Sequence, residues 1–221
     1  MELQLYSLAY PVTALGPGRR VAVWVAGCPL RCKGCITPHL LSNDAGKSIA
    51  VPRLAQRLLQ LPVPLDGMTL TGGEPFAQAE ALAALLSLLK AERPQWNVLM
   101  FSGFTLRQWQ RGDPAQRQLL QEIDVLVDGP YLAGQPGRHP LTASANQQLH
   151  LLTPRAQTLK AALDALPTNT ANLGVNPQGE DCLIGIVDPH ARRRLHRGLR
   201  LTTPEREQTT ESGGRHHVEF Y

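Results

Sequence analysis

Three of the four cysteines in this 221-residue chain lie close together, at Cys28, Cys32 and Cys35. Spacings of four and three residues bring the three thiols within reach of one metal centre if the backbone wraps around it as a loop. Gly27 and Gly34 allow that wrapping. Thiolates favour soft centres, either zinc or an iron–sulfur cluster, and three local cysteines leave one coordination position unassigned.

The identity of the centre depends on what completes this ligand set. A [4Fe-4S] cluster held by three cysteines keeps one iron open for a substrate, whereas structural zinc needs a fourth protein ligand. His39, only four residues past Cys35, or the distant Cys182 could supply that ligand, so zinc stays open at this point. Cys182 lies in an apolar segment, where a cysteine packs as a small hydrophobe. An unmetallated or redox role for the thiols is the third alternative.

A second group of residues, Gly72 to Pro75, follows a short apolar segment that predicts a strand. Its two glycines, Gly72 and Gly73, let a ligand approach the backbone closely, and the carboxylate of Glu74 can pair with an ammonium group. The same residues also fit an ordinary turn from strand to helix, with Pro75 in the first helical turn and Glu74 favoured by the helix dipole.

Further polar residues stand at the ends of later predicted strands. Ser102 and Gly103 follow the next strand and offer a hydroxyl group and an unobstructed backbone. Asp128 and Asn146 end or precede two later strands. Their side chains could close a binding site, and roles in turns and caps fit them equally well.

Short apolar segments ended by glycine or proline alternate with segments that carry apolar residues at helical spacing. This alternation predicts a largely parallel sheet covered by helices. Such sheets place functional residues at the C-terminal ends of their strands, where the motifs above fall. The expected strands are 21–26, 68–71, 97–101, 124–127, 148–152 and 182–187, and the expected helices are 51–61, 77–92, 106–109, 115–123 and 154–166.

The bulk composition is that of a globular protein with one main domain. Its 43% hydrophobic content is ordinary, and the longest apolar run, at 81–89, is about half of what a membrane span requires. The N-terminus lacks the basic and apolar stretches of a secretory signal, so we expect a cytoplasmic location. In that reducing compartment, clustered cysteines indicate a metal or redox site rather than disulfides.

The net charge of +4 is concentrated near the C-terminus, where residues 189–221 contain seven arginines and four glutamates. The rest of the chain is nearly neutral, which argues against a nucleic-acid-binding face on the core. The arginines at 192–194, with Arg197 and Arg200, could touch phosphates, but a solvated helical face or a docking tail is the favoured interpretation.

The C-x3-C-x2-C spacing after a first strand resembles the radical S-adenosylmethionine superfamily. Neighbouring segments resemble one branch of it, the activating proteins of anaerobic ribonucleoside-triphosphate reductase. The resemblance runs in order from about Gly16 to Leu152. Its segments are Gly16 to Arg19, Gly27 to Pro29 with Gly34 and Cys35, Thr71 to Pro75, Phe101 to Thr105, Asp124 to Tyr131, and Ser144 to Gln147.

The resemblance implies an α/β fold, a partial and open parallel β/α barrel of the radical SAM type with about six strands and a basic C-terminal extension. Residues 1–152 would form the radical SAM core, and residues 153–200 would form an α/β extension packed on it. The segment 201–221 has no apolar periodicity and is expected to be a mobile tail.

The resemblance also implies the chemistry. Cys28, Cys32 and Cys35 would hold a [4Fe-4S] cluster at which S-adenosylmethionine is cleaved reductively to methionine and a 5′-deoxyadenosyl radical. Glu74 would meet the amino group of the methionine moiety. Contacts to the rest of the cofactor would come from Gly72, Gly73, Pro75, Ser102, Gly103, Asp128 and Asn146.

The expected partners are a glycyl-radical enzyme subunit, namely anaerobic ribonucleotide reductase, and a low-potential electron donor such as flavodoxin or ferredoxin. Two alternatives stay open: a radical SAM enzyme that modifies another peptide, protein or small molecule, and a zinc-stabilised binding module without catalysis.

The chain departs from the family pattern at two positions near the third cysteine. Gly34 stands where much of the superfamily has a bulky residue that packs on adenine, so that contact would come from elsewhere, and Ile36 is the candidate. Thr37 and Pro38 stand where the branch commonly has Asn-Pro, so the hydrogen bond from that asparagine needs a substitute.

Overall fold

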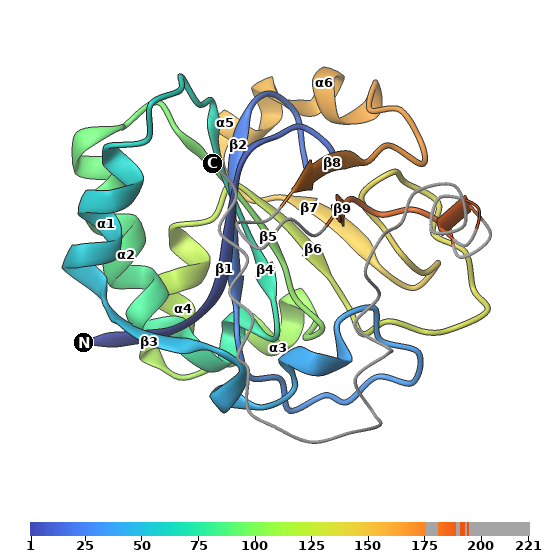
Figure 1. Ribbon diagram of the computed structural model, residues 1–221, viewed down its shortest axis with the longest axis horizontal. Coiled ribbons are helices and arrows are strands. Elements are labelled where there is room, and N and C mark those ends of the chain that lie inside the picture. Colours follow the sequence, from blue (N-terminus) through green and yellow to red (C-terminus); the bar gives the residue numbers. More distant parts are fainter. Residues whose placement is uncertain (176–180, 189–190, 193, 195–221) are drawn as a thin grey trace.

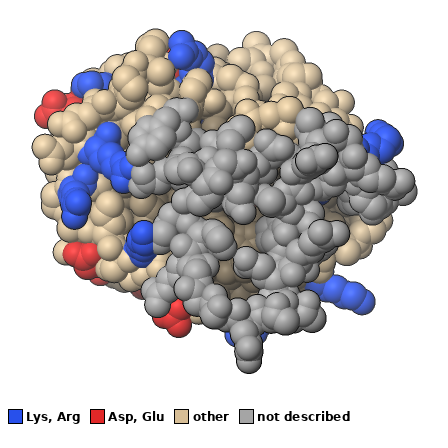
Figure 2. Space-filling view, in the orientation of Figure 1, with Lys and Arg blue, Asp and Glu red and all other residues tan. Residues whose placement is uncertain are grey.

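The computed structural model describes residues 1–175, 181–188, 191–192 and 194. The tail predicted at 201–221 lies outside these residues, as do most arginines of the basic C-terminal segment. Within the described part, no helix is long and apolar enough to cross a membrane. On the face shown in Figure 2, the coloured basic side chains are interspersed with acidic and uncharged surface.

A seven-stranded sheet forms the centre of the structure, with strand order β3-β1-β2-β4-β5-β6-β7 (Figure 1). The four central strands are parallel, and the other three pair antiparallel with their neighbours. The sheet is open, which confirms the predicted fold class. The strands are β1 (Glu2–Val12), β2 (Arg20–Val25), β3 (Lys47–Ala50), β4 (Gly67–Gly72), β5 (Asn97–Phe101), β6 (Val125–Asp128) and β7 (Gln148–Leu151).

Helices cover one face of this sheet. In Figure 1, α1, α2 and α4 lie together to the left of the strands, with α2 packed against both α1 and α4. This central position explains the wide apolar face of α2, because neighbours on several sides exclude water from its Ala and Leu side chains. The bounds are α1 (Val51–Leu59), α2 (Ala79–Glu92), α3 (Leu106–Gln110) and α4 (Pro114–Gln121), with the short 3-10 helices η1 (Pro38–Leu40), η2 (Asn43–Ala45) and η3 (Pro75–Gln78).

The segment after β7 covers the opposite face. Ala156 and Leu163, from α5 (Pro154–Thr158) and α6 (Lys160–Asp164), are buried in one cluster with Val125 and Val127 of β6. The predicted helix at 154–166 is therefore present as two short helices. Within the same segment, Thr153 caps α5 and also donates a hydrogen bond to Asp124 at 2.6 Å.

An antiparallel hairpin of β8 (Asn172–Val175) and β9 (Asp181–Ile184) packs on this second face (Figure 1). Ile184 is buried in a cluster with Ala22 and other residues of β1 and β2. The side-chain oxygen of Asn172 accepts hydrogen bonds from the backbone N–H groups of Thr13 and Ala14, each at 2.9 Å. These contacts hold the hairpin on the turn that follows β1.

Three strands were not expected from the sequence. β1 and β3 lie towards one edge of the sheet, where exposed positions carry polar side chains and blur the apolar pattern of a buried strand. β8 lies in the polar stretch predicted to be loose, and pairing with β9 stabilises it. The other expected strands and helices are present within a few residues of their predicted bounds.

A buried arginine joins the N-terminal ends of the central strands. Arg20, at the start of β2, is fully buried, and its guanidinium donates to the side chains of Thr69 and Asn97 at 2.7 Å each. It also donates to the carbonyl groups of Pro17, Met68 and Asn97. The opposite, C-terminal ends of the same strands carry the candidate site.

Candidate metal centre and cofactor site

The cysteine loop, residues 26–41, begins directly after β2. Its two ends are joined by backbone hydrogen bonds from Gly27 N–H to Leu40 O at 2.8 Å and from Cys28 N–H to Leu41 O at 3.1 Å. Gly27 has a φ of +87° and lies against the side chain of Asn43, so an L residue there would be strained and would clash. The protein's own backbone therefore holds the two ends of the loop together.

The three clustered thiols are free and half-buried. The Sγ atom of Cys35 accepts a hydrogen bond from the N–H of Thr37 at 3.4 Å. The Thr37 hydroxyl donates to Gly72 O at 3.4 Å, so Thr37 itself ties the third cysteine to the end of β4 at the point where the family commonly has asparagine.

The three thiols fit the ligand set of a [4Fe-4S] cluster. Three thiolates can bind three of the four irons of such a cluster. The structure places all three free thiols on one loop, whose two ends are joined by backbone hydrogen bonds.

The two candidates for a fourth ligand lie in packed surroundings. The rings of His39 and Tyr6 lie against each other, tilted by 49° with centroids 5.2 Å apart, and burial lowers the pKa of His39. Cys182 is in β9 and packs in the cluster that contains Trp24 and Phe101 on the second face of the sheet. Hydrophobic packing thus accounts for Cys182, in line with its apolar sequence context.

The Gly72 to Pro75 segment is hydrogen-bonded to the base of the cysteine loop. Gly73 N–H donates to Val25 O at 2.7 Å, and Glu74 N–H donates to Gly27 O at 2.8 Å. A Cβ atom on Gly73 would collide with the carbonyl oxygen of Gly27, so only glycine permits this approach. Pro75 is buried and begins η3. The two motifs that are separate in sequence are one unit in the structure.

Glu74 is only 1% exposed, and its carboxylate accepts three hydrogen bonds from the protein. Oε1 accepts from Ser102 Oγ at 2.8 Å and from Phe76 N–H at 2.9 Å, and Oε2 accepts from Gly103 N–H at 2.8 Å. Burial raises the pKa of Glu74 to about 7, while the three hydrogen bonds act in the opposite direction. Both the expected site residues after β5 therefore converge on Glu74.

The charge of Glu74 also acts on the first thiol of the cysteine loop. Burial raises the pKa of the Cys28 thiol, and the nearby charges of Glu74 and Cys35 raise it further, against hydrogen bonds from the backbone of Leu30 and Arg31. A cationic metal centre would reverse this balance, because it stabilises the thiolate form.

The remaining expected site residues lie in different settings. Asp128 accepts a hydrogen bond from Leu106 N–H at 2.6 Å and lies 3.0 Å from His150 Nε2. Asn146 donates to Pro130 O at 2.7 Å, while its buried side-chain oxygen has no hydrogen-bond partner among the residues that the structure describes. Such an unpaired acceptor suits a ligand donor. Ile36 is 51% exposed beside the cysteines, where it is free to contact a bound group.

Sequence patterns missed two residues that contact this site. Phe76 supplies a backbone donor to Glu74, and the indole N–H of Trp109 donates to Ser102 Oγ at 3.0 Å. Trp109 lies in the predicted helix after β5, and its apolar spacing there signals only burial.

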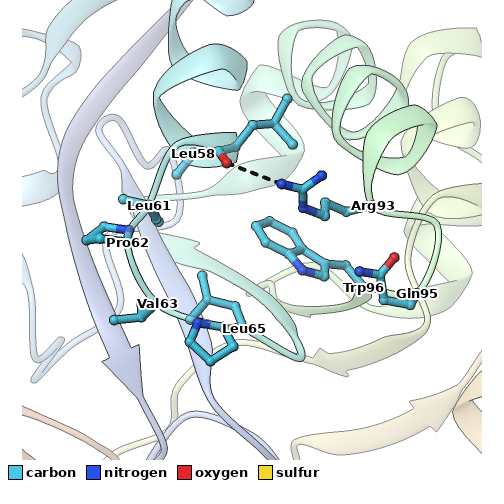
Figure 3. A pocket seen from close by; sticks show the side chains of 10 residues that line it. Leu58, Leu61, Pro62, Val63, Leu65, Arg93, Gln95 and Trp96 are labelled. Atoms are coloured by element: carbon cyan, nitrogen blue, oxygen red, sulfur yellow. Dashed lines mark hydrogen bonds between the residues drawn. The ribbon is translucent and has the colours of Figure 1, made fainter.

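Two hollows in the described part of the chain lie away from the cysteines. A cavity of about 370 Å³ is lined by residues 58–59 and 61–65 with Arg93, Gln95 and Trp96, before the first residues of β4 and β5 (Figure 3). Arg93 closes one side of it by donating to Leu59 O at 3.4 Å. A second hollow of about 360 Å³ lies beside the N-terminus and η3. Neither is lined by a cysteine.

Comparisons with known proteins identify the family of the chain. Residues 14–150 match the family described as a 4Fe-4S single cluster domain. An anaerobic ribonucleoside-triphosphate reductase-activating protein from Vibrio cholerae is 33% identical over 156 residues, which are 67% of this chain and 98% of that protein. The protein of the same name from Enterobacteria phage T4 is 31% identical over 65% of this chain and 92% of its own length. QueE from Escherichia coli, a solved structure, is 15% identical with a TM-score of 0.43, over 72% of this chain and 67% of that one.

An open sheet with four parallel central strands and a three-cysteine loop at their C-terminal ends, together with this family match, defines the class: a radical S-adenosylmethionine enzyme with a [4Fe-4S] cluster. Within that class, the chain belongs to the family of anaerobic ribonucleoside-triphosphate reductase-activating proteins. The predictions for the family, the cofactors and the enzyme class are confirmed.

Proposed function

We propose that this chain cleaves S-adenosylmethionine reductively and uses the resulting radical to generate a glycyl radical on a partner, the anaerobic ribonucleoside-triphosphate reductase. The observation that carries the proposal is the docking of Glu74 and its two glycines on the cysteine loop, through Gly27. One rigid unit thus holds both the proposed cluster ligands and the proposed cofactor ligand. The Vibrio cholerae and phage T4 relatives, which this chain matches over 98% and 92% of their lengths, are named as activating proteins of that reductase.

The proposed reaction gives the cysteines and Glu74 separate roles. Cys28, Cys32 and Cys35 would hold the cluster, and Glu74 would accept from the ammonium group of S-adenosylmethionine. When bound, the cluster supplies the one electron that splits the sulfonium into methionine and a 5′-deoxyadenosyl radical. In the proposed reaction, this radical would take a hydrogen atom from a glycine of the partner, which would leave 5′-deoxyadenosine and the glycyl radical. The buried surroundings of Glu74 exclude water from the ammonium site.

An electron donor reaches the cluster from outside the chain in this proposal. Three residues of the cysteine loop, Arg31, Lys33 and Ile36, are exposed, so a donor protein can approach close to the thiols. A flavodoxin or ferredoxin of low potential fits the role, and the chain would then act in the cytoplasm, where such donors and reduced thiols are found.

The proposed domain organisation separates a catalytic core from a C-terminal extension. Residues 1–152 would form the radical SAM core, and residues 153–200 an extension packed on it, which the contacts of α5, α6 and the hairpin support. About a third of this chain has no counterpart in the Vibrio cholerae relative, since 67% of this chain covers 98% of that protein. This surplus favours one second candidate, a radical enzyme of the same chemistry with another target.

The deciding experiment is anaerobic reconstitution followed by quantitation of iron, sulfide and zinc, and then incubation with dithionite and S-adenosylmethionine. We expect four irons per chain and formation of 5′-deoxyadenosine. A four-iron protein that forms none would overturn the proposal. Adding the reductase and recording an electron paramagnetic resonance spectrum separates the two candidate targets, because a glycyl radical appears only if the reductase is the substrate.

A further inference from the structure

Trp109 is a fully buried residue of α3 whose only polar atom has one partner. Its indole N–H donates to Ser102 Oγ at 3.0 Å. An indole nitrogen can only donate, and a buried donor without an acceptor is costly, so the pair fixes the direction of this hydrogen bond. Ser102 must accept from Trp109.

The hydroxyl of Ser102 has no remaining capacity to donate or accept a hydrogen bond. It accepts from Trp109 and from the N–H of Phe104 at 3.1 Å, and it donates to Glu74 Oε1 at 2.8 Å. A hydroxyl group has one proton and two lone pairs, and all three are used. Ser102 therefore points its proton at Glu74 and has none to offer to a cofactor.

Packing connects Trp109 to the same carboxylate by a second route. The ring of Phe76 meets Trp109 edge to face, with centroids 4.1 Å apart, and the backbone N–H of Phe76 donates to Glu74 Oε1. Both donors to Oε1 are thus held by Trp109, one through a hydrogen bond and one through an aromatic contact.

One acceptor position of Glu74 is left over. A carboxylate has about four lone-pair sites, and within the described part of the chain two are filled on Oε1 and one on Oε2. A Cβ atom on Gly103 would lie 3.5 Å from Oε2 and would collide with the side chain of Leu30 from the cysteine loop. The unfilled acceptor site is therefore on Oε2, the carboxylate oxygen on the side of Gly103 and of Leu30 in the cysteine loop.

We propose that Trp109 is a positioning residue, which acts through Ser102 and Phe76 to hold Glu74 Oε1 so that Oε2 is presented to the ammonium group of the ligand. The proposal rests on the proposed function, because it takes Glu74 as the group that meets S-adenosylmethionine. It reassigns Ser102 from a cofactor contact to the link between Trp109 and Glu74.

The first test uses the protein without its cluster and does not depend on activity. The chain has three tryptophans, so ¹⁵N-labelled tryptophan gives three indole signals, and Trp109→Phe identifies the one from Trp109. In Ser102→Ala, we expect that signal to shift and its proton to exchange with solvent at least about tenfold faster, because the acceptor is lost. Ser102→Thr keeps the hydroxyl and should restore the signal. A Trp109 signal that is unchanged in Ser102→Ala would overturn the proposal.

The second test measures the affinity of the reconstituted protein for S-adenosylmethionine. We expect the Kd to rise about fivefold or more in Trp109→Phe and in Ser102→Ala, with Ser102→Thr close to the unmodified protein. Trp96→Phe is the matched control, because Trp96 is 5% exposed and precedes β5 at the opposite end of the strand. It creates a similar cavity and should leave the Kd unchanged. Equal iron content in all variants shows that the cluster is not the cause.

Glu74→Gln separates failure of the two proposals. If Glu74→Gln leaves the Kd unchanged, Glu74 is not the ligand, and the site in the proposed function is wrong. If Glu74→Gln weakens binding while Trp109→Phe and Ser102→Ala do not, the site stands and the positioning role of Trp109 is wrong. If Ser102→Ala does not fold, Trp109→Phe against Trp96→Phe still decides the matter.

Discussion

Two buried charges, Arg20 and Glu74, lie at opposite ends of the same central strands. Arg20 at the N-terminal ends has five N–H donors, and the structure gives each of them an acceptor. Glu74 at the C-terminal ends accepts three hydrogen bonds from the described residues, which leave one of its acceptor sites unfilled. The difference separates a charge that holds strands together from a charge that is prepared for a ligand.

The pKa values of Arg20 and Glu74 also distinguish a structural charge from one prepared for a ligand. Burial lowers the pKa of Arg20 to about 10, with Asp66 and Asp124 acting in the opposite direction, so its charge is constant around neutral pH. Burial raises the pKa of Glu74 to about 7, so its charge is held less firmly. A ligand ammonium group would complete the interactions of Glu74 and stabilise its charged form.

The largest effect is expected from the thiols at the C-terminal edge. Cys28→Ala, Cys32→Ala or Cys35→Ala should each abolish formation of 5′-deoxyadenosine, because each removes a ligand of the cluster. Cys182→Ala is the control, since Cys182 packs on the other face of the sheet. Iron quantitation and product analysis check the result, and loss of the cluster in Cys182→Ala would indicate a site with four thiolates instead.

The two charges should then differ in what their removal costs. Arg20→Met leaves the buried groups of Thr69 and Asn97 without their donors and should lower the free energy of unfolding by about 3 kcal/mol or more. Glu74→Gln keeps the shape of the side chain and should cost much less in stability while it weakens S-adenosylmethionine binding. Urea denaturation and binding measurements on both variants sharpen the comparison, and equal stability losses would break it.

The pH dependence of stability gives a finer test on the cluster-free protein. The folded state holds the Glu74 proton with a pKa of about 7, against 4.5 as the ordinary value, so it binds more protons than the unfolded state between these values. The contribution is therefore fully present below about pH 4.5 and is lost as the pH rises through about 7, by up to about 3 kcal/mol. Glu74→Gln should remove this slope, which denaturation curves at several pH values can measure. A slope that persists in the variant would show that other groups cause it.

The smallest effect is expected from the extension. Asn172→Ala removes the acceptor that the N–H groups of Thr13 and Ala14 share, and we expect a loss of about 1–2 kcal/mol. Hydrogen exchange at the hairpin should speed up more than exchange in the central strands. Asn172→Asp retains the side-chain acceptor and serves as the control. If the hairpin stays as protected in Asn172→Ala, then apolar contacts alone hold it.

Local sequence patterns determined the positions of the main site motifs and of the main helices. The sequence itself shows the spacing of the cysteines, the two glycines before Glu74, and Ser102 and Gly103 after a predicted strand. These motifs could be expected at one site because parallel strands bring their C-terminal ends to one edge of the sheet. The main helices are legible for the same reason, since their apolar spacing matches the face that they bury.

Only the tertiary structure decided which of these groups touch. The bonds from Trp109 to Ser102 and from Ser102 to Glu74 cross between elements, and Ser102 is separated from Glu74 by 28 positions. The sequence also left β1, β3 and β8 unseen, because their pairing comes from neighbours rather than from their own pattern. Residue types and spacing thus settled the chemistry, whereas long-range packing settled the orientation of Glu74, since a carboxylate takes its direction from donors that distant segments supply.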